Sequence, residues 1–350
     1  MNTLNPTIRL DALKKFVTHY AAHYNLDINS LTPASADASF RRYFRINTSI
    51  LASVPATYII MDAPPEYENC TSFIEVARLF SVANLNLPTV LEQDSEQGFL
   101  LLKDLGNDTY LSILQQGKDH RPLYKDAITA LINLQAASLS THSQMALPVY
   151  GADKLQQEMN LFETWFLTKH HNIILNERER GLLQVALQLI TTACTTQATV
   201  WVHRDYHCRN LMVTPIDNPG ILDFQDALTG AYTYDLVSLL RDAYIDWPEE
   251  AQIDLALIYW TQAKSAGIPV PQDFGQLWRD FEWMGLQRHL KILGIFARLS
   301  HRDGKHNYLN DLPLVLKYAQ SVAQRYDGLG ILVRLFDRVH RIERQAGVIF

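Results

Sequence analysis

The segment 199–224 concentrates the residue types that could carry chemistry. An apolar strand pattern ends at His203, a polar loop follows, and a second apolar pattern begins directly after that loop. The loop reads His-Arg-Asp-x-x-x-x-Asn, with Asp205 in its third position and Asn210 in its last. After a turn, the next strand pattern ends in Asp223, which an aromatic residue follows. Three polar side chains therefore fall at predicted strand ends within a short stretch.

Phosphoryl transfer needs these residue types in this order. One carboxylate must accept a hydrogen bond from the attacking hydroxyl, which suits Asp205 in the exposed loop. The Mg²⁺ that accompanies ATP prefers hard oxygen ligands, such as the amide oxygen of Asn210 and the carboxylate of Asp223. Any one of these residues could instead be a turn or cap residue, because Asp commonly plays that part in loops. The three together favour a kinase that uses ATP and Mg²⁺.

Other catalytic patterns are weaker. His203 and His207 flank Asp205, which leaves a zinc hydrolase as a minor alternative, but the sequence offers no third zinc ligand with comparable spacing. The sequence contains no P-loop, no complete dinucleotide fingerprint and no G-x-S-x-G elbow. Phosphoryl transfer remains the preferred chemistry.

Composition restricts the class of protein further. The chain has 350 residues, 47% of them hydrophobic, which is enough for two lobes. Its 31 Lys and Arg against 37 Asp and Glu give a net charge of −6, which argues against a nucleic-acid partner. No apolar run is long enough to span a membrane, and the three cysteines form no recognisable pairing pattern. We expect a cytoplasmic enzyme acting on a small molecule, with no membrane or obligate protein partner.

The hydrophobic patterns indicate a β-rich section followed by a helical one. An amphipathic helix is expected over 8–22, and a second over 71–84 with a capping box formed by Ser72 and Glu75. Short aromatic and β-branched runs predict strands at 40–46, 56–61 and 98–102. Beyond residue 106, helical periodicity recurs at 122–138, 153–169, 178–194, 235–245, 249–266, 273–303 and 311–326. This predicts an α+β fold with an N-terminal nucleotide-binding lobe at 1–105 and a C-terminal catalytic and substrate-binding lobe at 106–350.

The segment from His203 to Leu240 resembles the aminoglycoside phosphotransferase and choline kinase superfamily. Those enzymes carry an H-x-D-x-x-x-x-N loop, a strand that ends in a metal-binding Asp, and then a Gly and an Asp-Leu pair, here Gly230 and Asp235-Leu236. Within the superfamily the sequence motifs are most similar to those of the anomeric kinases of N-acetylmuramate and N-acetylglucosamine. The matching strings are Ala36-Asp-Ala-Ser-Phe-Arg-Arg-Tyr-Phe-Arg45, Met61-Asp-Ala-Pro-Pro65, Leu222-Asp-Phe-Gln-Asp226 and Leu286-Gln-Arg-His-Leu-Lys-Ile-Leu-Gly-Ile-Phe-Ala-Arg-Leu299.

The resemblance implies a two-lobed, protein-kinase-like fold and assigns roles to the motif residues. It implies that Asp205 is the base, with His203 in the same catalytic motif, and that Asn210 and Asp223 bind metal. It also implies that Asp235 braces the catalytic loop from the following helix, although an Asp at that place could equally be the N-cap of the helix.

The nucleotide site departs from the kinase pattern. The strand that should carry a phosphate-binding lysine, Tyr58–Asp62, has none. The missing cation could mean an inactive, kinase-like binding module, or a substitute from the first hairpin. The phosphate-covering loop contains small residues but no glycine, and backbone N–H groups there could still approach a phosphate. The expected ATP-binding residues are Ser39, Phe40, Arg41, Arg42 and Arg45 from this hairpin, with Lys103 and Leu105 beside the adenine.

The acceptor is expected to be a small molecule, because the stretch between Asp223 and Asp235 is too short for the activation segment of a protein kinase. On the helix expected at 273–303, a stripe of basic residues begins at Arg288 and continues through Lys291, Arg298 and Arg302. Such a stripe is commonly a solvated face, but its sign suits an anionic or neutral sugar better than an aminoglycoside. The expected acceptor-binding residues are Arg209, Gln225, Asp226 and Arg288.

These observations predict an ATP-dependent sugar kinase that phosphorylates the anomeric (C1) hydroxyl of N-acetylmuramate or N-acetylglucosamine and feeds cell-wall precursor recycling. Two alternatives stay open. One is a kinase of another hydroxyl acceptor, such as an aminoglycoside or choline. Choline would need an aromatic cage, which Trp278, Trp283 and Tyr308 could form. The other is a catalytically inactive binding module.

Overall fold

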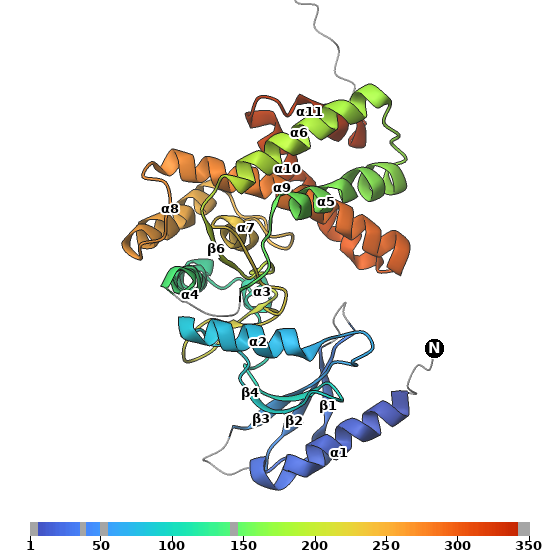
Figure 1. Cartoon of the computed structure of the whole chain (residues 1–350), viewed down its shortest axis with the longest axis vertical. Helices are drawn as coiled ribbons and strands as arrows, with labels where there is room; N and C mark the ends of the chain where they lie inside the picture. The colour runs from blue at the N-terminus through green and yellow to red at the C-terminus, as the bar shows by residue number, and fades with distance from the viewer. Residues whose placement is uncertain (1–5, 36–39, 50–54, 141–145, 342–350) are drawn as a thin grey trace, which may run out of the picture. The chain divides into compact units, whose positions relative to one another are not determined.

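The computed structural model describes residues 6–35, 40–49, 55–140 and 146–341, and its contacts divide the chain into two units (Figure 1). The first unit comprises residues 1–108 and 211–226, and the second comprises 109–210 and 227–350. The first break thus falls at 108 rather than at 105, and the segment 211–226 returns to the first unit.

The return of this segment has a local cause in backbone pairing. It contains the two-stranded hairpin β7 (Leu211–Met212) and β8 (Gly220–Ile221). The N–H of Ile221 donates to the carbonyl of Asn86 at 2.9 Å, and the N–H of Val213 donates to the carbonyl of Asp108 at 2.7 Å. The hairpin therefore belongs by its hydrogen bonds to the first unit, although its sequence neighbours belong to the second.

The first unit is built on a five-stranded sheet in which every neighbouring pair is antiparallel. The strand order is β1-β2-β3-β5-β4, so one crossover places β5 beside β3. The sequence predicted β2, β3 and β5 but not β1 and β4. Those two strands are short, have exposed residues and lack apolar alternation. The strands are β1 (Thr32–Ser35), β2 (Arg42–Asn47), β3 (Thr57–Asp62), β4 (Val90–Asp94) and β5 (Phe99–Lys103).

Helix α1 (Pro6–Tyr24) covers one face of this sheet (Figure 1). Its apolar stripe, which includes Leu13, Phe16 and Val17, packs against Ile60 and its neighbours on the three central strands. Burying each such side chain contributes about 1.5–3 kcal/mol. The amphipathic pattern expected over 8–22 is confirmed, and this burial explains why the helix forms.

Helix α2 (Cys70–Phe80) lies on the other side of the sheet and begins differently from the prediction. Its N-cap is Asn69, whose side chain accepts a hydrogen bond from the N–H of Thr71 at 2.8 Å. The capping box predicted for Ser72 and Glu75 is therefore wrong, because the earlier Asn starts the helix and leaves Ser72 inside its first turn.

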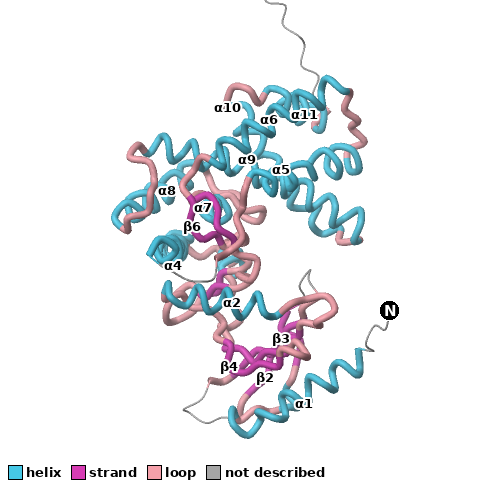
Figure 2. The backbone as a smooth tube through the Cα atoms, in the orientation of Figure 1, coloured by secondary structure: helices cyan, strands magenta, loops and turns pink. Residues whose placement is uncertain are grey.

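The second unit is mainly helical, and its described residues form strands only in the short antiparallel pair β6 and β9 (Figure 2). The predicted helix at 153–169 is two elements, because the α-helix changes into a π-helix at residue 162. The helices are α3 (Tyr110–Gln115), α4 (His120–Ser140), α5 (Ala152–Leu161), the π-helix (Phe162–His170), α6 (Glu177–Thr195), α7 (Tyr234–Leu240), α8 (Glu249–Ser265), α9 (Phe274–Asp303), α10 (Leu312–Arg325) and α11 (Gly330–Val339). The strands are β6 (Thr199–Val202) and β9 (Leu228–Ala231).

Helix α9 is the central helix of the second unit. It begins at the cap residue Asp273, whose side chain accepts from the N–H of Gln276, and ends at Gly304, where φ is +68°. Between residues 281 and 294 every side chain is buried, so neighbouring helices surround α9 in this part. Gly294 lies here, and a Cβ atom added to it would stand 2.5 Å from the backbone of Leu161, at the end of α5.

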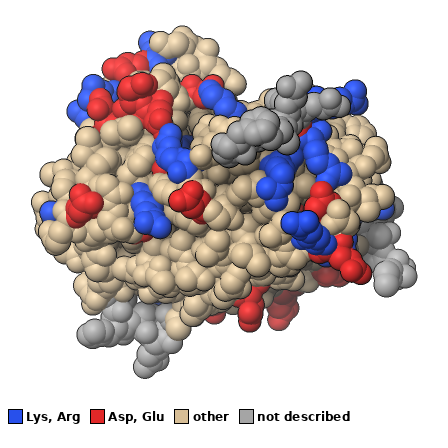
Figure 3. All heavy atoms as spheres, turned by 90° about the horizontal axis from the view of Figure 1, so that it is seen from above, with Lys and Arg blue, Asp and Glu red and all other residues tan. Residues whose placement is uncertain are grey.

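Charge is distributed without a large patch of one sign on the face shown in Figure 3, where basic and acidic side chains are interspersed on a mostly uncharged surface. Within the described residues, no helix has the length and apolar character that crossing a bilayer requires. The α+β prediction from the sequence is confirmed.

The close approach at Gly294 gives a prediction about stability. Gly294→Ala should lower the free energy of unfolding by about 1–3 kcal/mol, because the new methyl group meets backbone that cannot move aside. Gly285→Ala is the matched control in the same helix, since its Cβ would meet its nearest neighbour at 3.7 Å. Alanine should stabilise that site by up to about 1 kcal/mol. Urea unfolding of both variants checks this, and equal stability of the two would contradict it.

Candidate active site

The loop that follows β6 contains the predicted catalytic residues and is held by its own backbone. The N–H of His207 donates to the carbonyl of Asp205 at 3.1 Å, and the N–H of Asn210 donates to the carbonyl of His207 at 2.9 Å. The side-chain Nδ2 of Asn210 also donates to the Asp205 carbonyl, at 2.9 Å. These bonds give the loop a single tight conformation around Asp205.

Arg204 makes this loop conformation costly, because its φ is +80°, a region that side chains other than glycine rarely adopt. The carboxylate of Asp235 offsets that cost by accepting two backbone hydrogen bonds. One comes from the N–H of His203 at 2.6 Å and the other from the N–H of Arg204 at 2.9 Å. Asp235 thus holds the bend that precedes Asp205.

Asp235 lies in the first turn of α7 and is completely buried. The N-cap of this helix is Thr233, so the alternative that Asp235 is the cap residue is wrong. Burial raises the pKa of Asp235 to about 7, although the two backbone hydrogen bonds act in the opposite direction.

Asp205 differs from Asp235 in keeping 40% of its side chain exposed. Burial alone would raise its pKa, but the nearby positive charges, Arg288 foremost and Lys291 next, lower it to about 2. The nearest of these contacts joins Oδ1 of Asp205 to Nη2 of Arg288, 3.8 Å apart. Asp205 is therefore ionised at any physiological pH and presents a carboxylate that a hydroxyl group can reach.

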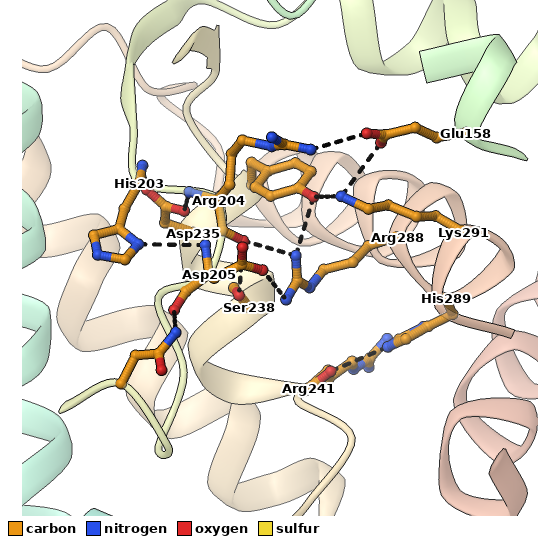
Figure 4. Close-up of polar contacts among 12 residues, drawn as sticks. Glu158, His203, Arg204, Asp205, Asp235, Ser238, Arg241, Arg288, His289 and Lys291 are labelled. Carbon is orange, nitrogen blue, oxygen red and sulfur yellow. Dashed lines mark hydrogen bonds and ion pairs between the residues drawn. The ribbon is translucent and has the colours of Figure 1, made fainter. Parts of the chain in front are cut away.

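Arg288 and Lys291 project from α9 into a buried polar network beside this carboxylate (Figure 4). Nη1 of Arg288 donates to the carbonyl of Arg204 at 2.8 Å and to the hydroxyl of Tyr234 at 3.0 Å. Nζ of Lys291 also donates to the Tyr234 hydroxyl at 3.0 Å, and lies 3.3 Å from Glu158. Glu158 in turn pairs with the Arg204 guanidinium at 2.9 Å.

The basic stripe expected on this helix is therefore not uniformly solvated. Arg288 and Lys291 are buried, Arg298 is half-buried and Arg302 is exposed. Sequence reasoning found Arg288 but did not assign roles to Glu158 or Tyr234, which lie on other helices. Periodicity reports which side chains share a face, but not what that face meets.

In the first unit, Asp223 follows β8 with a φ of +61°. Its Oδ1 accepts a hydrogen bond from Nε2 of Gln225 at 2.7 Å, while Asp226 is exposed. Phe224 is fully buried, and its ring centroid lies 4.7 Å from that of Phe73 on α2. The aromatic residue after Asp223 therefore anchors the segment that presents the carboxylate.

The three arginines expected to replace the missing lysine are all paired with carboxylates in the first unit. Arg41 meets Glu68 at 2.9 Å, and Nε of Arg45 donates to Asp104 at 2.6 Å. Nε of Arg42 donates to Asp62 at 3.0 Å.

Asp62 also accepts hydrogen bonds from Arg9 of α1, which identifies the face on which Arg42 lies. Arg42 therefore points to the α1 side of the sheet, and Arg45, three residues on, alternates to the other side.

The remaining nucleotide-binding candidates lie at the ends of the same sheet. Ser39 falls outside the described residues, and the adjacent Phe40 is 63% exposed and stacks on Tyr67 with ring centroids 4.7 Å apart. The N–H of Lys103 donates to the carbonyl of Thr89, and its Nζ lies 3.3 Å from Oδ1 of Asn86. Leu105 is buried.

Arg209, which was expected at the acceptor, belongs to the second unit. It is exposed, and its guanidinium carbon lies 4.0 Å from the centroid of the Tyr244 ring.

Taken separately, Asn210 and Asp223 carry atoms that suit Mg²⁺ better than zinc. The loop hydrogen bond of Asn210 uses its amide nitrogen, which a metal ion does not bind, rather than its oxygen. Asp223 adds a carboxylate, so both residues supply the hard oxygen atoms that Mg²⁺ prefers. The described part of the chain contains no group of three His, Cys, Asp or Glu side chains that could hold a metal, which argues against the zinc hydrolase alternative.

Comparison with known proteins agrees with this arrangement. Residues 30–274 match the phosphotransferase enzyme family. A protein of Neisseria meningitidis called N-acetylmuramate/N-acetylglucosamine kinase is 45% identical over 308 residues, which cover 87% of this chain and 89% of the relative. A Pseudomonas aeruginosa protein of the same name is 42% identical and covers 87% of each chain.

Solved structures with low sequence identity share the fold. An ADP-bound aminoglycoside phosphotransferase aligns with a TM-score of 0.57 at 15% identity, covering 87% of this chain and 97% of its own. A choline kinase from Streptococcus pneumoniae aligns with a TM-score of 0.60 at 11% identity, covering 89% and 99%. The expected protein-kinase-like fold is confirmed.

Three findings indicate phosphoryl transfer. They are the ionised carboxylate in the H-x-D-x-x-x-x-N loop, the family match and the relatives named as kinases. The alternative of a catalytically inactive module is therefore not supported. The chain belongs to the phosphotransferase enzyme family and is an ATP-dependent phosphotransferase with a hydroxyl acceptor.

Proposed function

We propose that this enzyme transfers the γ-phosphoryl group of ATP to the anomeric hydroxyl of N-acetylmuramate or N-acetylglucosamine, supplying cell-wall precursor recycling in the cytoplasm. The observation that carries the choice of acceptor is the pair of kinases of these two sugars at 42–45% identity over 87% of the chain. The ionised Asp205 beside buried cations supports the choice of chemistry.

In this proposal Asp205 orients the sugar hydroxyl by accepting its hydrogen bond, and takes its proton as the bond to phosphorus forms. A hemiacetal hydroxyl is more acidic than an ordinary alcohol, so a weakly basic carboxylate suits it better than it suits a primary hydroxyl. Asp235 acts by fixing the loop through the N–H groups of His203 and Arg204.

Nucleotide binding is proposed for the first unit. We assign ATP to the sheet residues predicted from the sequence, with Arg45 preferred over Arg42 because Arg42 lies on the α1 side. Asn210 and Asp223 would hold the Mg²⁺, which neutralises charge on the phosphates when bound. The other proposed contacts are Ser39, Phe40, Arg41, Lys103 and Leu105.

For the acceptor we propose Arg209, Gln225, Asp226 and Arg288 as contacts. An aminoglycoside is disfavoured, because its positive charges would meet those of Arg288 and Lys291 beside the base. Choline is disfavoured for a different reason. The three aromatic residues offered as its cage pack with separate partners, namely Trp278 with Phe281, Trp283 with Tyr326, and Tyr308 with Phe296.

The first prediction tests the base. Asp205→Asn keeps the size of the side chain but removes its proton acceptor, so turnover should fall by about 10²–10⁴-fold. The dissociation constant for ATP should stay within about threefold, because the change is at the reacting hydroxyl. Steady-state kinetics and nucleotide titration measure both, and near-wild-type turnover would remove Asp205 from the mechanism.

The second prediction tests the metal ligand. Asp223→Asn tolerates the left-handed backbone but loses the charge, so it should abolish turnover and weaken binding of Mg·ATP more than binding of metal-free ATP. Asp217→Asn is the matched control, since Asp217 has a φ of +52° in the same segment and is exposed. Equal weakening with and without Mg²⁺ would rule out the ligand role.

The third prediction tests the position of transfer. Both N-acetylglucosamine and N-acetylmuramate should consume ATP, whereas their 1-O-methyl glycosides, in which only the anomeric hydroxyl is blocked, should not. ADP release measured with each compound at matched concentrations decides this. Turnover of the methyl glycosides at a comparable rate would exclude the anomeric position and leave the kinase assignment in place.

A further inference from the structure

Arg288 is buried, and among the described residues its guanidinium is hydrogen-bonded through only one of its three nitrogens. Its Nη1 is occupied by the Arg204 carbonyl and the Tyr234 hydroxyl, at 2.8 Å and 3.0 Å. Its Nη2 faces Asp205 at 3.8 Å, which is too long for a hydrogen bond. Its Nε is buried and has no hydrogen-bond partner among the described residues. A buried guanidinium is seldom left with donors unused, so this one is suited to a further acceptor beside Asp205.

No other cation considered for the phosphate is placed like this. Arg41, Arg42 and Arg45 each contact a carboxylate in the first unit, and those contacts already offset their charges. Arg288 instead donates hydrogen bonds to the Tyr234 hydroxyl and the Arg204 carbonyl, which are both uncharged groups. Its nearest carboxylate oxygen is Oδ1 of Asp205, at 3.8 Å. Its positive charge is therefore directed at the place where the acceptor hydroxyl must be deprotonated.

We propose that Arg288 binds the phosphoryl group during its transfer, replacing the cation that β3 lacks, and that Tyr234 positions it. The inference rests on the proposed role of Asp205 as the base. It refines the acceptor contact proposed above for Arg288, because the guanidinium would bind the phosphoryl group as it reaches the acceptor oxygen and not a carboxylate of the sugar.

The step balances without a further reactant. The oxygen of the acceptor hydroxyl forms a bond to the γ-phosphorus, and the bond from that phosphorus to the β,γ-bridging oxygen breaks. The electron pair of the broken bond leaves on ADP, and the hydroxyl proton passes to Asp205. Negative charge on the equatorial oxygens of the phosphoryl group is held by the Nη2 donor of Arg288, which faces Asp205.

Tyr234 is a positioning residue because its hydroxyl joins the two α9 cations. It accepts from Arg288 and from Lys291, both at 3.0 Å, and it is completely buried. Burial would raise the pKa of Tyr234, but Lys291 and Arg288 lower it below its usual value. Glu158 completes the network by pairing with Lys291 and with Arg204, whose carbonyl accepts a hydrogen bond from Arg288 (Figure 4).

The experiment compares Arg288→Met, Arg288→Lys and Tyr234→Phe with Arg298→Met, a control that removes a half-buried arginine from the same helix. If Arg288 binds the transferred group, Arg288→Met lowers kcat by about 10²-fold or more with both sugars and leaves both KM values within about threefold. Arg288→Lys keeps the positive charge but loses the planar guanidinium with its several fixed donors, so it should recover only part of kcat. Tyr234→Phe lowers kcat about tenfold, and the control changes nothing.

A second measurement does not depend on the sugar. Aluminium fluoride with Mg²⁺ mimics the phosphoryl group in transit, so it should tighten ADP binding to the wild-type enzyme and to Arg298→Met. In Arg288→Met that tightening should fall by at least about tenfold, while affinity for ADP alone stays unchanged. Thermal unfolding of each variant identifies any that fails to fold, and Arg288→Lys then serves in its place.

Three outcomes overturn the inference. One is a raised KM for N-acetylmuramate alone, which would place the sugar carboxylate on Arg288. Another is wild-type kcat in Arg288→Met, and the third is a fluoride effect that is absent from the wild type or intact in Arg288→Met. If the wild type phosphorylates neither sugar, the proposed function fails, and the fluoride measurement still decides the role of Arg288.

Discussion

The two hydrogen bonds that the Asp235 carboxylate accepts from the backbone of His203 and Arg204 support the rest of the second-unit site. They hold Arg204 at a positive φ, and this sets the direction in which Asp205 leaves the loop. The same bend turns the Arg204 carbonyl toward α9, where it accepts a hydrogen bond from Arg288. Asp205 and its neighbouring cation Arg288 are therefore both oriented by one buried carboxylate.

Carboxylates offset much of the arginine charge in the first unit. Arg41 and Arg45 each contact one directly, and Arg9 and Arg42 share Asp62. Beside Asp205 the positive charges are less completely offset. Glu158 is shared between Arg204 and Lys291, and the uncharged hydroxyl of Tyr234 stands where a second carboxylate could be. Positive charge left over in this way lowers the pKa of Asp205 and favours anions beside it.

Local pattern was sufficient to predict some of this architecture. The loop from His203 to Asn210 and the strand end at Asp223 could be predicted because each motif lies within a few residues of a strand terminus. Strands β1 and β4 could not be, since neither alternates polar and apolar residues and each forms as the edge strand of the sheet, paired only with the strand that follows it.

The basic stripe on α9 shows a second limit of the sequence. Periodicity placed Arg288 and Lys291 on one face, but their burial depends on Glu158 and Tyr234, which come from other helices. The same holds for the division of the chain, where the return of 211–226 to the first unit depends on a hydrogen bond to Asn86.

Gly294 also bears on how this enzyme can change over time. It lies six residues after Arg288 on the same helix, about 9 Å along the axis at 1.5 Å per residue. A Cβ atom at 294 would meet the backbone and the Cβ atom of Leu161, which nearly every residue type at 161 would also present. An exchange at 161 therefore does not make room for a larger residue at 294, and sequence drift at this contact is constrained from the side of the glycine alone.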